Sequence, residues 1–260
     1  MPRILENRLI AEFKDRESFT REELFDFFCF YEPDLKEGTF GWRVFDLKNK
    51  NIIKSKIRGL YTLSTKPEYK PVISKDIYNI AKRISSKFTE IKYCLWEIDW
   101  INEFSQHQAN KNITFVEIEK DFVESLYYEL KDRLKNEIYL NPDENEINFY
   151  ISESNNPVVI KRLISRSPVT KHIISKTQFY TPSLEKMLVD LFTEDKLFYF
   201  SQGSELVRIY ENALNSYSIN FTTLLYYAKR RAKEQELKAF LANNLSHLVK
   251  EIFNDKKEML

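Results

Sequence analysis

Glycine is scarce in this sequence, which has four in 260 residues, at positions 38, 41, 59 and 203. Their spacing excludes a glycine-rich loop that cradles phosphate groups and the sharp turn that presents a nucleophilic serine in hydrolases. Histidine is also rare: His107, His172 and His247 lie far apart, and none has a partner at the spacing of a zinc site. We therefore expect no catalytic residue, no metal and no cofactor.

Cysteines and long apolar segments are lacking too. Cys29 and Cys94 both lie among apolar residues, so we expect two buried free thiols rather than a disulfide. No apolar stretch follows a basic N-terminus or is long enough to cross a bilayer, so we expect a cytoplasmic protein without a membrane partner. The net charge of +1 creates no global field, and electrostatic arguments depend on local clusters.

One such cluster lies near the N-terminus. Residues 1–37 carry 6 Lys or Arg and 10 Asp or Glu, whereas residues 38–66 carry 7 and 1. Within "IIKSKIRGLY", residues 52–61, alternate positions are occupied by Lys54, Lys56 and Arg58. Because successive side chains of a strand point to opposite faces, we predict a cationic ribbon on one face. Gly59 would supply the positive φ that its turn requires.

Three helices are predicted before this ribbon. Apolar spacing indicates one at about residues 3–14, and a capping box of Thr20 and Glu23 begins a second that Pro33 ends. Thr39 is expected to cap the third. Its apolar side would contain Phe40, Val44 and Leu47, and its other side Trp42, Arg43, Asp46, Asn49 and Lys50. Three helices followed by a two-stranded ribbon is the order of a winged helix-turn-helix domain.

A winged helix can bind DNA by placing its third helix in the major groove and its ribbon along the phosphates. We predict this role here, with Arg43 within reach of a guanine edge and Trp42 packed against the wing. Asp46 would repel phosphate. The alternative is that the ribbon cations only solvate an exposed hairpin. Since one winged helix reads few base pairs, we expect two copies on an inverted repeat.

The rest of the chain predicts a second domain. Pro67 and Pro71 mark a linker over residues 67–75, between a first domain of residues 1–66 and a second of residues 76–260. Strands are predicted at 91–98, 112–118, 146–152 and 157–164, with a helix at 122–134. From Thr181, expected as a cap ahead of Pro182, the pattern is helical. The fold class is therefore α+β: a winged helix-turn-helix, then a mixed α+β domain with a helical C-terminal half.

Four segments together resemble a known family. The wing ends in "RGLYTLS", the middle contains "CLWEIDWINEFSQHQ" and "ITFVEIEKDFVESLYYEL", and "TPSLEKMLVDLF" precedes the helical end. These resemble the AbiEi-type antitoxins of bacterial abortive-infection (type IV toxin–antitoxin) systems. The resemblance implies an autorepressor that binds double-stranded DNA at an operator and counteracts a nucleotidyltransferase-like toxin encoded nearby. It carries the DNA-binding role onto Arg43, Lys54, Lys56 and Arg58, to which we add Thr39, Trp42 and Lys50.

A second basic segment is the candidate for the antitoxin surface. No acid occurs between Glu153 and Glu185, and the segment contains Lys161, Arg162, Arg166, Lys171 and Lys176. A cationic face could compete with the toxin for an anionic partner or meet an acidic metal site in the toxin. Lys161, Arg162, Arg166 and Lys171 are the predicted surface residues. The alternative is an ordinary solvated face in which the two arginines are paired with acids elsewhere.

Two alternatives to an antitoxin stay open: a magnesium-dependent nuclease and a regulator that senses a small ligand. Glu97 and Asp99, with Glu117 and Glu119 on a neighbouring strand, could surround Mg²⁺ as in a nuclease, although Lys120 would point to the opposite face from Glu119. Gly203 and Ser204 resemble the glycine-serine pair of nucleotidyltransferases. No paired metal-binding carboxylates follow them on a neighbouring strand, so we expect Ser204 to cap a helix from Glu205. The second alternative, a regulator that senses a small ligand, would require a pocket.

Overall fold

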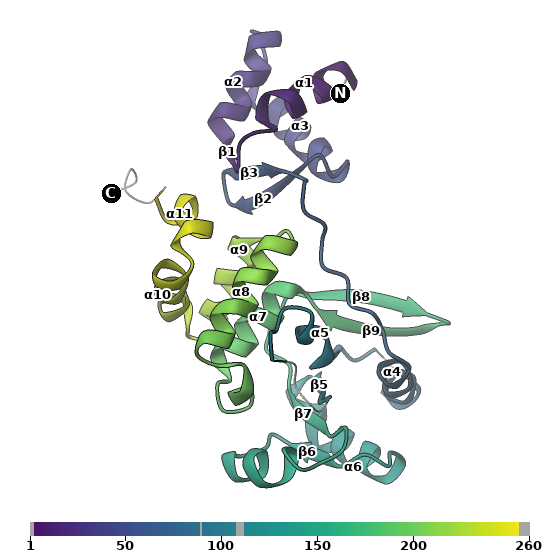
Figure 1. Ribbon diagram of the computed structural model, residues 1–260. Coiled ribbons are helices and arrows are strands. Elements are labelled where there is room, and N and C mark those ends of the chain that lie inside the picture. The colour runs from purple at the N-terminus through teal and green to yellow at the C-terminus, as the bar shows by residue number, and fades with distance from the viewer. Residues whose placement is uncertain (1–2, 89, 108–111, 255–260) are drawn as a thin grey trace. The chain divides into compact units, whose positions relative to one another are not determined.

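The computed structural model describes residues 3–88, 90–107 and 112–254. The chain is mixed α+β, as expected, and divides into two compact units (Figure 1). The first contains Met1–Glu68, Ser216–Thr222 and Leu241–Leu260, and the second contains Tyr69–Asn215 and Thr223–Phe240. None of the described helices combines the length and apolar character needed to cross a membrane.

Residues 3–63 of the first unit form three helices and a small sheet in the order of a winged helix. The elements are α1 (Arg3–Phe13), β1 (Phe19–Thr20), α2 (Arg21–Tyr31), α3 (Glu37–Asn49), β2 (Ile53–Ile57) and β3 (Leu60–Leu63). The three strands form an antiparallel sheet in the order β1-β3-β2. Its core is aromatic, and the rings of Phe13 and Phe19 stack at 4.1 Å between centroids. The capping box is confirmed: Thr20 and Glu23 exchange hydrogen bonds at the start of α2.

Two local expectations for this unit are wrong. Thr39 does not cap α3, because the helix begins at Glu37 with Lys36 at the cap position, one turn earlier than the glycine at 38 suggested. Cys29 is only half-buried, whereas Cys94 is fully buried, and both thiols are free.

The second unit is built around a six-stranded mixed sheet. From residue 75 onward the elements are α4 (Lys75–Lys87), β4 (Tyr93–Glu97), α5 (Asp99–Asn102), β5 (Thr114–Ile118), the 3-10 helix η1 (Lys120–Phe122), α6 (Val123–Arg133), β6 (Ile138–Leu140), the π-helix η2 (Glu146–Ile151), β7 (Val158–Arg162), β8 (Val169–Ile174), β9 (Thr177–Pro182), α7 (Leu184–Thr193), the 3-10 helix η3 (Tyr199–Ser201), α8 (Ser204–Ser216), α9 (Phe221–Arg230), α10 (Glu234–Asn244) and α11 (Ser246–Asn254). Of these, α11 and the last residues of α10 belong to the first unit. The strand order is β6-β7-β5-β4-β9-β8. The pairs β4–β5 and β8–β9 are antiparallel, and the other three are parallel.

The strand predicted at 146–152 is wrong. Asp143 and Glu146 exchange hydrogen bonds between side chain and backbone, as a capping box does, and begin a helical turn. Ile147 and Ile151 then bury one side of η2, while Phe149 and Tyr150 are exposed. The expectation for Thr181 and Pro182 is also wrong, because both end strand β9 and Ser183 caps α7. Ser204 is the first residue of α8 rather than its cap.

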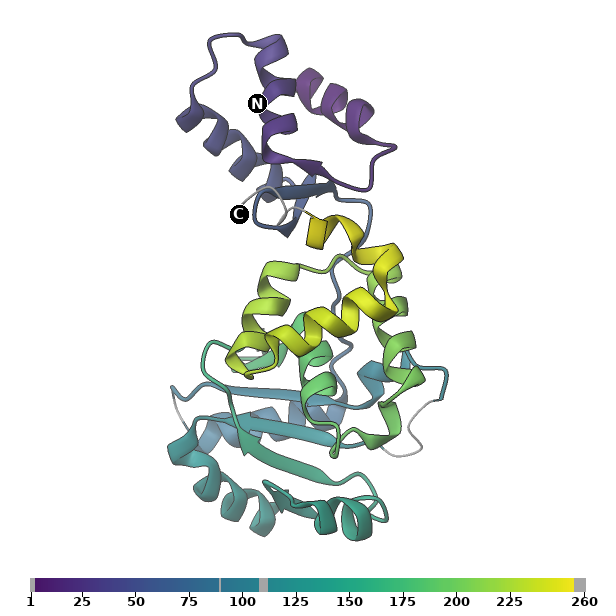
Figure 2. The same cartoon turned by 90° about the vertical axis from the view of Figure 1, so that its left-hand side faces the viewer.

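Helices cover both faces of this sheet (Figure 2). On one face, the Tyr93 hydroxyl donates to the Ala81 carbonyl of α4, and Lys87 of α4 lies 3.9 Å from Glu129 of α6. On the other face, Lys186 of α7 reaches Glu117 of β5 at 2.6 Å. Because side chains alternate along each strand, neighbouring residues of β4 and β5 contribute to two separate cores.

Candidate nucleic-acid interface

Helix α3 has one buried and one open side. Phe40, Val44 and Leu47 are buried at the spacing of a single helix face, as expected. On the opposite side, 73% of Trp42 and 55% of Phe45 are exposed. The expectation that Trp42 packs against the wing is therefore wrong. Its described ring contact is with Phe45, edge-on at 5.8 Å between the ring centroids. These two exposed rings form a small apolar patch on the open side of the third helix.

Three exposed cations lie near the two ends of α3 and at the wing tip. Lys36 at the start of α3, Lys48 in its last turn and Arg58 at the wing tip are exposed. Within the described part of the chain, none of the three forms an ion pair. The Lys48 ammonium lies 4.9 Å from the centre of the Tyr61 ring, and its partial burial lowers its pKa. Gly59 has φ +85 in the wing turn, as predicted, and holds Arg58 at the tip.

The wing does not form the uniform cationic face that alternation predicted. The pairing of β2 with β3 shifts between Ser55, which lies opposite Tyr61, and Ile57, which lies opposite Leu60. This bulge places Lys56 outside the regular alternation. The Lys54 ammonium donates to the Lys66 carbonyl at 3.0 Å and lies 3.7 Å from Glu68, with only 11% of its side chain exposed. Lys54 therefore ties the wing to the segment that follows it.

Arg43 and Lys50 are also held by acids. Arg43 pairs with Glu32 of the α2–α3 loop at 2.5 Å, and its guanidinium lies 5.2 Å from the centre of the Phe28 ring. With 16% of its side chain exposed, Arg43 points away from the open side of α3. Lys50 donates to Glu6 and Asp46, each at 2.7 Å, and these bonds raise its pKa to about 12. The same bond lowers the pKa of Asp46, whose charge is thus matched locally.

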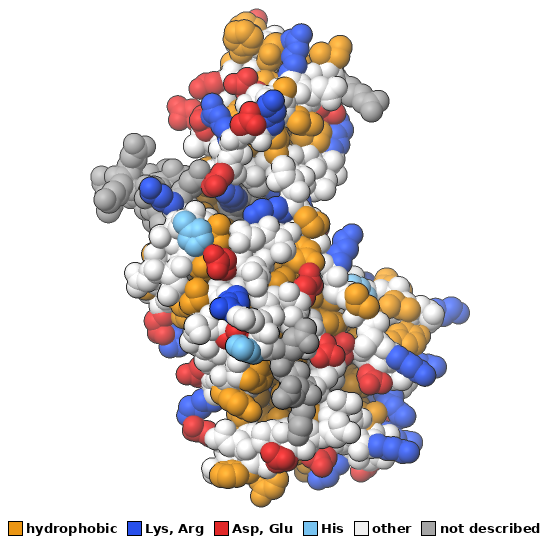
Figure 3. Space-filling view, viewed as in Figure 1, with side chains coloured by type: hydrophobic (Ala, Val, Ile, Leu, Met, Phe, Trp, Pro, Cys, Tyr) orange, Lys and Arg blue, Asp and Glu red, His pale blue; other side chains and the backbone are white. Residues whose placement is uncertain are grey.

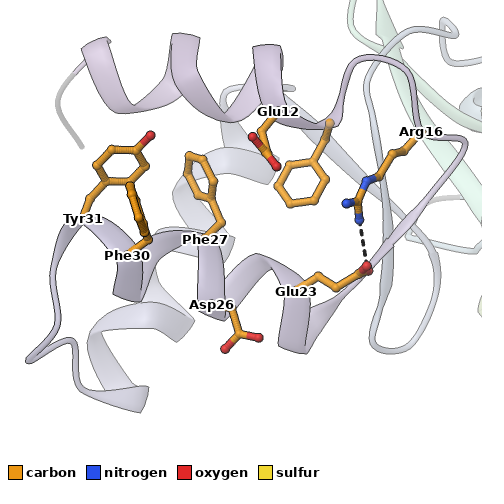
Figure 4. Close-up of a pocket in the computed structure, with 8 residues that line it drawn as sticks. Glu12, Arg16, Glu23, Asp26, Phe27, Phe30 and Tyr31 are labelled. Atoms are coloured by element: carbon orange, nitrogen blue, oxygen red, sulfur yellow. Dashed lines mark hydrogen bonds and ion pairs between the residues drawn. The ribbon is translucent and has the colours of Figure 1, made fainter.

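A hollow between α1 and α2 has the opposite charge (Figure 4). It has a volume of about 390 Å³ and is lined by Glu12, Phe13, Arg16, Glu23, Asp26, Phe27, Phe30 and Tyr31. Arg16 points to Glu23 and pairs with it at 2.7 Å, so the two other acids leave the hollow negative. Phosphate is repelled from such a surface. The first unit is therefore polarised, with α3 and the wing tip as its cationic side.

The second basic segment does not assemble into one surface. Lys161 is mostly buried on β7, where it pairs with Glu194 at 2.6 Å. Arg162 is exposed at the end of the same strand, and Arg166 donates to the Tyr226 hydroxyl at 2.9 Å. Lys171 is exposed on β8, which forms the opposite edge of the sheet from β7 and its neighbour β6. Four strand spacings separate β7 from β8, a distance of about 19 Å. The expected single antitoxin surface is therefore not formed.

The four strand acids do not converge either. The register pairs Glu97 with Thr114 and Cys94 with Glu117, so Glu97 and Glu117 point to opposite faces of the sheet. Glu97 accepts hydrogen bonds from Ser74 and Asn112, and burial raises its pKa. Asp99 and Glu119 are exposed. Among the residues the structure describes, no group of acids, histidines or cysteines is placed to hold a metal ion.

Glu117 instead belongs to a buried network that sequence reasoning missed. Its acids are Glu117, Asp190 and Glu194, and its bases are Lys161, Lys186 and Arg231. The side chains of Lys186, Glu117 and Asp190 are at most 1% exposed. Burial alone would lower the pKa of Lys186, but Asp190 and Glu117 outweigh it and raise that pKa well above its usual value. The charges balance, and the network joins α7 and the end of α9 to the sheet.

A sequence signal for this network exists. Lys186 and Asp190 lie four residues apart inside the apolar stripe of α7, which contains Leu184, Met187, Leu188 and Leu191. Charged residues within a buried stripe must find partners, because an unpaired buried charge is costly. The signal indicates a buried pair without identifying Glu117 or Arg231 as the partners.

The chain belongs to a family of unknown function, DUF6577, whose model matches residues 39–247. The match begins within α3 and ends in α11, so it includes the wing and the whole six-stranded sheet. A comparison with curated proteins gives no match.

Proposed function

We propose that this protein is a DNA-binding transcriptional autorepressor and an antitoxin of the AbiEi type, acting against a nucleotidyltransferase-like toxin encoded nearby. One observation carries the DNA-binding half. The side of α3 opposite the core exposes Trp42 and Phe45. Lys36 and Lys48 near the two ends of α3 and Arg58 at the wing tip are exposed and have no ion-pair partners among the described residues. The acidic hollow between α1 and α2 leaves this as the side of the winged helix that attracts phosphate.

The contacts divide into two kinds. The cations bind phosphates and set orientation, which adds affinity for any sequence. Thr39, Trp42 and Asn49 lie on the exposed side of α3, where an apolar ring can contact a thymine methyl group and an amide can pair with adenine. Base selection therefore comes from these residues rather than from Arg43, which pairs with Glu32.

The test measures binding to a duplex from upstream of the gene and to a random duplex, by fluorescence anisotropy over a range of salt concentrations. Replacing Lys36, Lys48 and Arg58 with alanine should weaken binding to both. The slope of log affinity against log salt should flatten by about 0.9 for each lost contact, or about 2.7 in total. Lys14→Ala, an exposed cation in the turn after α1, is the control and should change neither quantity.

Trp42→Ala separates the two kinds of contact. This variant should lose about 1–3 kcal/mol of binding free energy on the upstream duplex, with little change on the random duplex. We also expect two protein copies on each inverted repeat, which analytical ultracentrifugation of the complex would detect. Equal affinity and an unchanged salt slope in the triple variant would contradict the assignment of α3 and the wing tip as the DNA interface.

The antitoxin half is supported by the sequence resemblance. Co-expression of the full chain with a nucleotidyltransferase-type protein from the neighbouring gene should restore growth that the toxin alone prevents. The triple alanine variant should still protect when both genes are driven from foreign promoters, because protection then does not depend on operator binding. Death of cells that carry intact antitoxin would refute this half without affecting the DNA-binding result.

A further inference from the structure

A cleft of the second unit collects cations from two separate parts of the chain. It lies between α4 and the segment at the end of α6, has a volume of about 710 Å³ and reaches the sheet at Thr114, with Asn112 just before β5. Its cations are Lys82 and Arg83 of α4 and Arg133 and Lys135 at the end of α6, and its acid is Asp76. The lining therefore carries 4 − 1 = +3 charges. Figure 3 shows basic side chains over the exposed surface of α4.

Three of these four cations have no ion pair among the described residues of the fold. Lys82, Arg83 and Lys135 are exposed and have no ion-pair partner in the described ranges, and Arg133 lies 3.8 Å from Glu129 at the looser end of pairing distances. The basic residues of the buried network, in contrast, are all paired. Like charges that face one concave surface repel one another, and an anion in the cleft removes that repulsion.

The remaining lining is polar and rich in amides. It contains Asn79, Asn112, Asn136 and Asn156 together with Ser86, while Ile80 and Leu134 supply its apolar part. Two of these amides have structural roles, since Asn112 donates to Glu97 and Asn136 donates to the Asn156 carbonyl. The side chains of Asn79 and Asn156 make no such bond among the described residues and are exposed. A lining that combines several cations and amides with two apolar side chains, Ile80 and Leu134, suits a polar anion rather than an acyl chain.

We propose that this cleft binds a small phosphorylated molecule of nucleotide size that carries a di- or triphosphate. The volume falls within the range of about 300–1,000 Å³ typical of small-molecule sites. Arg83 and Arg133 present the planar fork that binds phosphate oxygens in pairs, and Lys82 and Lys135 add point charges from the two sides. The amides of Asn79 and Asn156 recognise the polar remainder of the ligand. This site makes the protein a ligand-responsive regulator, a role that goes beyond the proposed DNA-binding and antitoxin functions.

The test uses the full-length protein without DNA. Isothermal titration calorimetry with ATP, GTP and inorganic pyrophosphate should show binding at one site, and adenosine, which lacks phosphate, should show none. The double variant Arg83→Glu/Lys135→Glu should lower the affinity for ATP by about tenfold or more, as expected for lost charge-assisted hydrogen bonds. Lys75→Glu is the matched control, since Lys75 is exposed on the same helix but does not line the cleft, and it should bind as the wild type does. Circular dichroism and the thermal midpoint verify that each variant is folded.

A second variant tests the recognition of the remainder of the ligand. Asn79→Ala should weaken the binding of ATP and leave the affinity for pyrophosphate unchanged. Three results would overturn the proposal. The first is no heat of binding with any phosphorylated probe, and the second is an equal loss of ATP affinity in Lys75→Glu and the double variant. The third is a single-stranded oligonucleotide that binds through Arg83 and Lys135 more tightly than ATP does. The last would assign the cleft to a nucleic-acid strand. Because no operator is present, none of these outcomes depends on the function proposed for α3 and the wing.

Discussion

Replacing Lys186 with methionine should be among the most destabilising single changes in the second unit. Its ammonium lies 2.6 Å from Glu117 and 2.5 Å from Asp190, and the side chain is 0% exposed. Methionine fills a similar volume but leaves two carboxylates without this cation. Asp190 keeps Arg231 at 2.9 Å, whereas Glu117 keeps only the Trp96 indole N–H at 3.1 Å among its described partners. Breaking a buried pair in this way costs about 3–5 kcal/mol.

The assay is urea unfolding monitored by tryptophan fluorescence, because the Trp96 indole donates to Glu117 and reports on the network directly. Lys233→Met is the control, since Lys233 and Glu236 form an exposed pair whose loss should cost less than about 1 kcal/mol. Adding Glu117→Gln to Lys186→Met should recover part of the loss, because the glutamine carbonyl can still accept from Trp96 without a charge. If Lys186→Met costs no more than the control, or Glu117→Gln adds to the loss, the argument from unpaired charge is wrong.

Two further predictions concern pH and a helix start. Burial opposes ionisation of Glu194, but Lys161 and Arg231 outweigh it and lower its pKa from 4.5 to about 2. The ionised Glu194 carboxylate therefore stabilises the folded state above about pH 5, and this stabilisation is lost as pH falls towards about 2. It amounts to at most about 3 kcal/mol. Glu194→Gln should flatten the decline of the unfolding free energy at low pH, as measured by urea unfolding at several pH values. Thr20→Ala removes the capping box of α2 and should cost about 1 kcal/mol by thermal unfolding, whereas Thr20→Ser should cost little.

The elements that sequence reasoning located are those whose signal is local. The capping box of α2 and the stripe Phe40, Val44 and Leu47 are written within one or two turns of the chain, and both are confirmed. Strands β4, β5 and β7 were found as short apolar runs. The segment 146–152 was misjudged because isoleucines four residues apart fit both an alternating strand and one side of a helical turn, and the Asp143–Glu146 pair decided between them.

The candidate site could be predicted only in part, because charge pairing is a property of the folded chain. The polar residues of α3 were identified, but Arg43 turns to Glu32, which is eleven positions earlier in sequence and lies beyond the end of α2. Lys54 binds a backbone carbonyl that no composition argument could select. The bulge at Lys56 depends on how β2 pairs with β3, so alternation within one strand could not reveal it.

Pairing also separates structural cations from functional ones. In the second unit, Lys161, Lys186 and Arg231 are distant in sequence, yet each finds an acid within 2.9 Å because an unpaired charge in the core would be costly. Lys82, Arg83 and Lys135 lie on the same unit with exposed acids elsewhere on its surface, and they gather instead on one hollow with amides between them. Folding alone gives no reason for this convergence, since exposed cations are stable in water wherever they point. A bound phosphorylated ligand would supply that reason, which is why the calorimetric comparison of the Arg83 and Lys75 variants is the sharpest test of the second unit.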